Sequence, residues 1–72
     1  MLTKTVQQSL VLTARFILNK TGVYFDGDKR FAMGDLALRT IGIMKDADTG
    51  IISNQDACVQ LEQIRQQVEK FI

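Results

Sequence analysis

The chain has 72 residues, with nine Lys plus Arg, eight Asp plus Glu, one cysteine and no histidine, proline or tryptophan. This length predicts one small domain over residues 1–72, and a formal charge of +1 argues against a polybasic nucleic-acid arm or an acidic DNA mimic. Without histidine and with a single thiol, the chain does not fit a disulfide scaffold, most zinc sites or imidazole chemistry. No apolar run is long enough for a bilayer span and no export signal is visible, so we expect a cytoplasmic protein with no membrane partner.

Residues of about 4–20 form the first predicted helix. Thr5 and Gln8 have the spacing of a capping box, in which each side chain satisfies a free backbone N–H of the other residue. Gly22 is available for a left-handed cap at the end of the helix. The apolar residues that recur at helical spacing are Val6, Leu10, Ala14 and Ile17. The residues that widen this stripe beyond one face are Val11, Leu12, Phe16 and Leu18.

Residues of about 23–32 have the pattern of a β-hairpin, with apolar segments on both sides of Asp26-Gly27-Asp28. A turn at Asp26-Gly27 and a turn at Gly27-Asp28 both fit the sequence. The second is preferred because it pairs Tyr24 with Phe31 and Asp26 with Lys29. We therefore expect a hairpin with one face on the helices.

The second predicted helix covers about residues 35–45. Its predicted buried stripe is Met33, Leu36, Ala37, Ile41 and Met44, with Leu38 and Ile43 on the flanks. Gly42 lies inside this helix, where glycine costs about 1 kcal/mol relative to alanine. It marks either a close helix crossing or an earlier helix end.

The third predicted helix covers about residues 54–71. Ser53 is its expected N-cap, with Asp56 as a shorter substitute for the usual Glu of a capping box. The apolar residues of its two-heptad seam are Ala57, Leu61, Ile64, Val68 and Phe71. The predicted fold class is therefore mainly α, a small three-helix domain with a β-hairpin between helices one and two. It becomes α+β if Ile51-Ile52 adds a third short strand.

The connection between the second and third helices resembles an EF-hand loop. With Gly50 as the turn glycine, Ile52 takes the hydrophobic position and Asp56 the last ligand position. The first and third ligand positions then carry Lys45 and Ala47 instead of acids. Because calcium requires six to eight oxygen ligands, we predict no calcium site and a plain helix–turn–helix connection.

Two functional hypotheses follow from these patterns. No glycine-rich phosphate loop, nucleophile motif or cofactor site is present, and Cys58 fits a small buried side chain better than a reactive thiol, so we expect no enzyme. The leading hypothesis is a small regulatory or adaptor protein that acts by protein–protein contact, as a homodimer or on a larger protein target. The residues predicted to bind the partner are Leu61, Ile64, Val68 and Phe71 of the third helix and Leu12 and Phe16 of the first.

The alternative hypothesis is a small nucleic-acid-binding regulator. Lys29 and Arg30 would contact phosphate from the predicted hairpin, and Tyr24 would stack on bases beside them. The other basic residues are spread along the chain and interleaved with acids, so this hypothesis ranks second.

Overall fold

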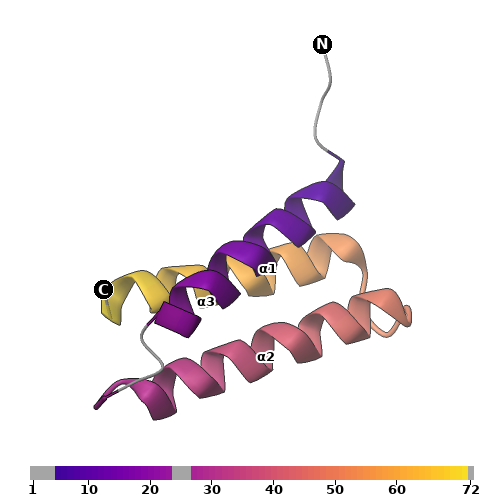
Figure 1. Ribbon diagram of the computed structural model, residues 1–72. Coiled ribbons are helices and arrows are strands. Elements are labelled where there is room, and N and C mark those ends of the chain that lie inside the picture. Colours follow the sequence, from indigo (N-terminus) through magenta and orange to yellow (C-terminus); the bar gives the residue numbers. More distant parts are fainter. Residues whose placement is uncertain (1–4, 24–26, 72) are drawn as a thin grey trace.

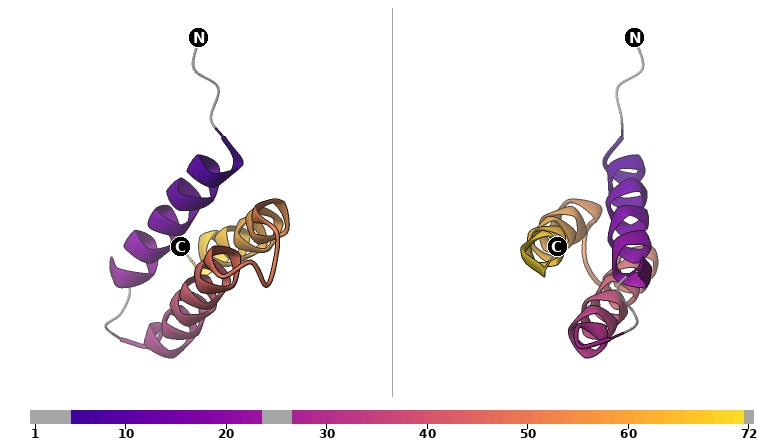
Figure 2. Two further views of the ribbon diagram at one scale, coloured as in Figure 1. Left: turned by 90° about the vertical axis from the view of Figure 1, so that its right-hand side faces the viewer. Right: turned by 60° about the vertical axis from the view of Figure 1, so that its left-hand side comes forward.

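Three α-helices make up the protein (Figure 1). The computed structural model describes residues 5–23 and 27–71, and its helices are α1 (Val6–Val23), α2 (Arg30–Asp48) and α3 (Asn54–Phe71). Each helix runs opposite to the one before it (Figures 1 and 2). All three pairs of helices are in contact, and α1 packs most extensively against α3.

Helix α1 begins with the predicted capping box. The Thr5 backbone N–H donates to the Gln8 side-chain oxygen at 3.0 Å, and the Gln8 N–H donates to the Thr5 hydroxyl at 3.1 Å. The predicted left-handed cap at Gly22 is wrong, because the helix continues through this residue to Val23. Thr21 is buried and its hydroxyl donates to the Leu18 carbonyl, so the last turn of α1 packs in the core.

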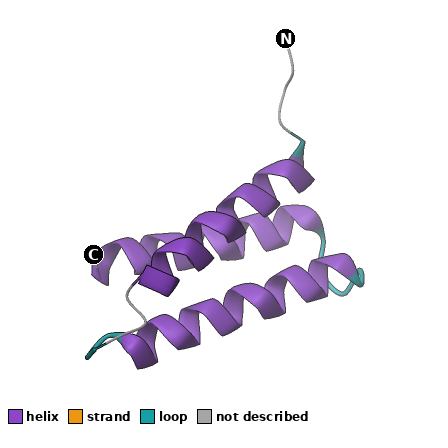
Figure 3. Cartoon of the chain, viewed as in Figure 1, coloured by secondary structure: helices purple, strands orange, loops and turns teal. Residues whose placement is uncertain are grey.

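The predicted β-hairpin over residues 23–32 is wrong: the described residues contain no strand, and residues from Arg30 onward belong to α2 (Figure 3). The turn signal itself is real, since Gly27 has φ +92° and its carbonyl accepts a hydrogen bond from the Arg30 N–H. This turn leads into a helix. Lys29 is the N-cap of α2 and makes no side-chain capping bond. The sequence therefore lacks the Ser, Thr, Asp or Asn cap that would have predicted a helix start here. The predicted pairs of Tyr24 and Asp26 lie outside the described residues.

Helix α2 ends in a Schellman motif centred on Gly50. Gly50 has φ +82°, and its N–H donates to the Ala47 carbonyl at 3.3 Å. The Ile51 N–H donates to the Asp46 carbonyl at 2.9 Å, which satisfies a second free carbonyl of the helix end. Ile51 and Ile52 lie in this turn, so the optional third strand is also wrong.

Helix α3 has the bounds that the sequence predicts. The Asp56 N–H donates to the Ser53 hydroxyl at 3.0 Å, which confirms Ser53 as the N-cap. The seam of α3 faces the other two helices, and Ala57, Leu61 and Val68 have no exposed surface.

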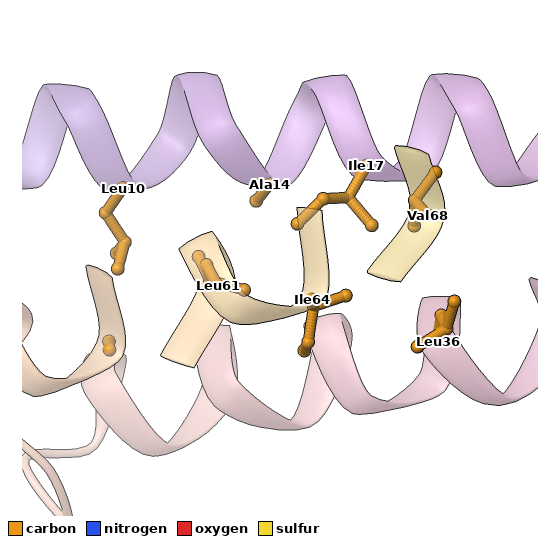
Figure 4. Close-up of a cluster of buried hydrophobic side chains, with 8 residues drawn as sticks. Leu10, Ala14, Ile17, Leu36, Leu61, Ile64 and Val68 are labelled. Carbon is orange, nitrogen blue, oxygen red and sulfur yellow. The ribbon is translucent and has the colours of Figure 1, made fainter. Parts of the chain in front are cut away.

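The core lies between the three helices (Figure 4). It consists of Leu10, Ala14 and Ile17 of α1, Leu36 of α2 and Ala57, Leu61, Ile64 and Val68 of α3. Met33 and two threonines, Thr21 and Thr40, are buried as well. The Thr40 hydroxyl donates to the Leu36 carbonyl of its own helix at 2.9 Å, so burial leaves this polar group satisfied.

The buried stripe of α2 differs from the predicted one. Met33 and Leu36 are buried as expected, but Thr40 takes the position next along the core face and Ile43 packs beside it. Ile41 was placed in the predicted stripe and is instead 53% exposed. The prediction failed because α2 carries apolar residues on two sides, and helical spacing alone combined them into one stripe.

Candidate functional site: an apolar outer face on helix α2

Three large apolar side chains of α2 point into solvent. Phe31 is 77% exposed, Leu38 is 70% exposed and Ile41 is 53% exposed. Residues seven and three positions apart lie on the same side of a helix, so these three form one stripe along α2. We call Phe31, Leu38 and Ile41 the outer face of α2. Its exposure sets it apart from the side of the same helix that carries Leu36 and Thr40.

Gly42 borders the outer face and is not required by the fold of a single chain. The helix continues six residues beyond it, and a Cβ built at this position would meet no atom within 4 Å. Neither explanation offered by the sequence, a close crossing within the chain or an early helix end, applies. Glycine inside a helix nevertheless costs about 0.5–1 kcal/mol relative to alanine. No atom of this chain lies close enough to require a glycine at this position.

Charged residues of both signs surround the outer face. Asp35 lies one turn before Leu38, and Lys45 lies two turns after it. Arg39 is on the flank of α2 that borders the α2–α3 groove, where its Nε lies 3.0 Å from the Asp35 carboxylate. Near the start of the helix, the Arg30 guanidinium stacks on the Phe31 ring at 4.8 Å from the centroid.

The predicted partner-binding residues separate into two groups. Leu61, Ile64 and Val68 are buried in the core of the single chain, and burial leaves them almost no surface to offer a partner while this fold is intact. The apolar seam of α3 is thus covered by α1 and α2. Phe71 is 40% exposed and Leu12 is 46% exposed, so both keep surface that a partner could cover.

Phe16 is half-buried on α1 and close to a cation of its own helix. The Lys20 ammonium lies 5.7 Å from the centroid of the Phe16 ring. Leu12 and Phe16 therefore form a smaller partly exposed area on α1, separate from the outer face of α2.

The residues predicted to contact nucleic acid do not form a hairpin wing. Lys29 and Arg30 lie at the start of α2, and Tyr24 is outside the described residues. The Lys29 ammonium donates to the Phe71 carbonyl, which links the start of α2 to the end of α3. A cation at this end also interacts favourably with the helix dipole of α3.

The other polar features of the described residues are surface grooves and ion pairs. An open groove between α2 and α3 is lined by Arg39, Asp46 and three glutamines of α3. Within residues 5–23 and 27–71, no three His, Cys, Asp or Glu side chains lie close enough to hold a metal ion. Lys45 and Ala47, the two positions that weakened the resemblance to an EF-hand loop, lie in the last turn of α2.

Cys58 packs against the edge of the core. It is half-buried, and its thiol donates to the Val6 carbonyl at 3.5 Å. This contact joins α3 to the first turn of α1, in keeping with a small packed side chain.

A charged cluster on α3 links Arg65 to two glutamates. Its guanidinium donates to the carboxylates of Glu62 and Glu69, with distances of 2.8 Å from Nε to Glu62 and 2.6 Å to Glu69. The hydrogen bonds from Arg65, with its positive charge in support, lower the pKa of Glu62 against a smaller opposing effect of burial. All three side chains remain partly exposed, as is typical of a helix surface.

Sequence reasoning missed the outer face of α2 because it assigned Ile41 to the core and Leu38 to a flank. A signal was present: the apolar residues of α2 are too numerous for one stripe, while a threonine, Thr40, falls at core spacing from Leu36 and Met33. Threonine can be buried in a helix when its hydroxyl bonds to the preceding turn. With Thr40 as a core residue, Ile41 falls about 100° around the helix from the core side.

Comparisons with known proteins leave the family of the chain open. No protein-family model matches it, and neither the curated proteins nor the solved structures give a significant match. None of the described helices combines the length and the apolar character that crossing a membrane requires.

Proposed function

We propose that this chain is a small non-enzymatic regulatory or adaptor protein that acts by protein–protein contact and self-associates through the outer face of α2. The observation that carries the proposal is the exposure of Phe31, Leu38 and Ile41 on one side of a helix whose opposite side builds the core. A helix that is apolar on two sides is stable in water when both sides are covered. Large apolar side chains exposed along one side of a helix and bordered by charged residues are typical of an interaction surface.

The size of the chain supports the same conclusion. A domain of 72 residues buries only about 60% of the surface of its unfolded chain, so its core supplies limited stability. Joining two copies enlarges the apolar interior without lengthening the chain. Covering Phe31, Leu38 and Ile41 would remove the large exposed apolar side chains of α2 from water.

Sedimentation velocity over a wide concentration range tests the proposal. We expect the unmodified chain to sediment as a concentration-dependent oligomer and Leu38→Glu to sediment as a monomer, because the new charge cannot be buried unpaired. Val59→Glu is the matched control: Val59 is 59% exposed on α3, away from the outer face, and its replacement should leave association unchanged. Circular dichroism checks that both variants keep their helices.

Two results would contradict the proposal. A chain that stays monomeric at the highest concentration has no self-association to explain. Equal association of Leu38→Glu and the unmodified chain would place the interface elsewhere. Leu12 on α1 would then be tested next, because it is 46% exposed and is among the residues predicted to bind the partner. Lys29 and Arg30 lie at the start of α2 and not in a hairpin, so nucleic-acid binding is the second candidate. Titration with duplex and single-stranded nucleic acid at low salt, where phosphate contacts are strongest, tests it separately.

A further inference from the structure

We infer that the outer face of α2 binds the same face of a second copy of this chain, with the two α2 helices antiparallel and Leu38 opposite the second copy's Ile41. This inference rests on the proposed function and gives it a partner, a direction and a register. A twofold axis between the two helices makes the contact self-complementary. Leu38 of each copy then meets Ile41 of the other, and no unpaired interface is left for a third copy.

The apolar residues and the charges around them together define the register. Leu38 and Ile41 lie three residues apart near the middle of α2, so they form the compact part of the outer face. In an antiparallel pair, placing Leu38 against the second copy's Ile41 also places Ile41 against the second copy's Leu38. A register that pairs Leu38 with the second copy's Leu38 would instead set Ile41 against its Asp35. A register that pairs Ile41 with the second copy's Phe31 would set Leu38 against its Gly34, and Lys45 would then lie beyond the start of the second α2. The charges around the outer face distinguish these registers.

The charges around the outer face favour this arrangement over a parallel one. In the antiparallel register, Asp35 comes within about one residue, 1.5 Å along the axis, of the second copy's Lys45. Arg30 also lies within about one residue, 1.5 Å along the axis, of the second copy's Asp48. By symmetry each pair occurs twice. A parallel pair in the same register would instead place Asp35 beside Asp35 and Lys45 beside Lys45, where like charges repel.

The remaining cation near the crossing, Arg39, lies beside the same Asp35 carboxylate, which it would share with the second copy's Lys45. Arg39 lies on the flank that faces the α2–α3 groove and is held there by Asp35 of its own helix. Its position leaves the surface around Leu38 and Ile41 open to a second helix.

Gly42 provides the space for a close crossing. It lies one residue after Ile41, where the outer face borders the α2–α3 groove, is exposed, and has open space where a side chain would be. Glycine on a helix surface lets a second backbone approach closely. A second copy at this position explains why α2 keeps a glycine that its own chain does not need.

A charge-swap experiment on the full chain tests the direction and register. Lys45→Asp places two acidic pairs across the interface, and Asp35→Lys places two basic pairs. Each should raise the dimer dissociation constant about tenfold or more at low salt. The double variant Asp35→Lys with Lys45→Asp restores opposite charges and should return the dissociation constant to within about threefold of the unmodified value. Restoration is expected only for the antiparallel pair, since a parallel pair stays repulsive in all variants.

A second measurement separates the effect on the fold from the effect on association. Gly42→Ala should raise the melting temperature of the dilute monomer by about 3–6 °C and raise the dimer dissociation constant about fivefold. Gly22→Ala is the matched control, because Gly22 is also exposed within a helix with no atom near its Cβ position, but on α1. It should raise the melting temperature and leave association unchanged.

The outcomes distinguish this inference from the proposed function. Association that is lost in Leu38→Glu but not restored by the charge swap would overturn the antiparallel register and leave the proposed function standing. A Gly42→Ala variant that dimerises as well as Gly22→Ala would overturn the close crossing. A chain that is monomeric at all concentrations would overturn both the inference and the proposed function.

Discussion

Helices α2 and α3 differ in how they distribute their apolar residues, although both pack against α1 and have nearly the same length. In α3 the buried residues form one narrow seam, and glutamines and charges occupy most of the rest of its surface. In α2 one apolar side lies in the core, and a second one, the outer face, lies in solvent. A single chain therefore accounts for the apolar residues of α3, whereas it leaves those of the outer face of α2 uncovered. The comparison shows that a regular apolar seam can be covered within one chain, while the less regular helix leaves large apolar side chains exposed.

Replacing a leucine in each helix gives the largest expected contrast. Leu61 of α3 is fully buried, so Leu61→Ala should lower the free energy of unfolding by about 2–5 kcal/mol, most of the stability of so small a domain. Leu38 of α2 is 70% exposed, so Leu38→Ala should change the stability of the dilute monomer by less than about 0.5 kcal/mol. Urea denaturation at low concentration measures both. Similar losses in the two variants would mean that the outer face is covered within the monomer.

Two glycines of the α2 region should respond to alanine in opposite directions. Gly50 has φ +82° in the Schellman motif, and a side chain in this left-handed conformation costs about 1–2 kcal/mol. Gly42 is helical and has open space around it, so alanine there should add about 0.5–1 kcal/mol to the stability of the dilute monomer. Thermal unfolding followed by circular dichroism measures both changes. If Gly42→Ala also destabilises the monomer, the cost of this glycine lies within the chain and its role in a close crossing fails.

Local signals allowed much of α1 and α3 to be predicted from the sequence. The capping box at Thr5 and Gln8 and the N-cap at Ser53 fixed two helix starts, because each places a side-chain acceptor three residues before a free N–H. The α3 seam was recognised because no other apolar stripe competes with it. Spacing identifies a buried side without identifying what buries it: Leu61, Ile64 and Val68 are buried within the single chain, and their role in partner binding stays a prediction.

The region between residues 23 and 45 could not be predicted in the same way. Short apolar segments around a glycine turn fit both a strand and the end of a helix, and the missing side-chain cap at Lys29 removed the signal that would have decided. The outer face of α2 could not be recognised from hydrophobicity alone. The core side carries Thr40, whereas the solvent side carries Leu38 and Ile41. A prediction based on hydrophobicity therefore assigns the wrong side of α2 to the core.

Acid titration gives the smallest expected effect and concerns the polar side of α3. Because the hydrogen bonds from Arg65 lower the pKa of Glu62 in the folded chain below its ordinary value of 4.5, the ionised carboxylate favours the folded state. This contribution is complete above pH 4.5 and is lost as the pH falls below 4.5 through the lowered folded pKa. In Glu62→Gln the contribution is absent at every pH. Urea midpoints of the unmodified chain should therefore exceed those of Glu62→Gln near neutral pH and converge with them in acid.

The difference between these two chains isolates one group, because all other carboxylates titrate in both. The pair is partly exposed, so salt screens it and the difference in urea midpoints should shrink as ionic strength rises. A difference that persists unchanged at about pH 3 would show that Glu62 stabilises α3 by packing instead of by its charge. That result would weaken the contrast drawn between the helices, because the polar side of α3 would then contribute to the core as well.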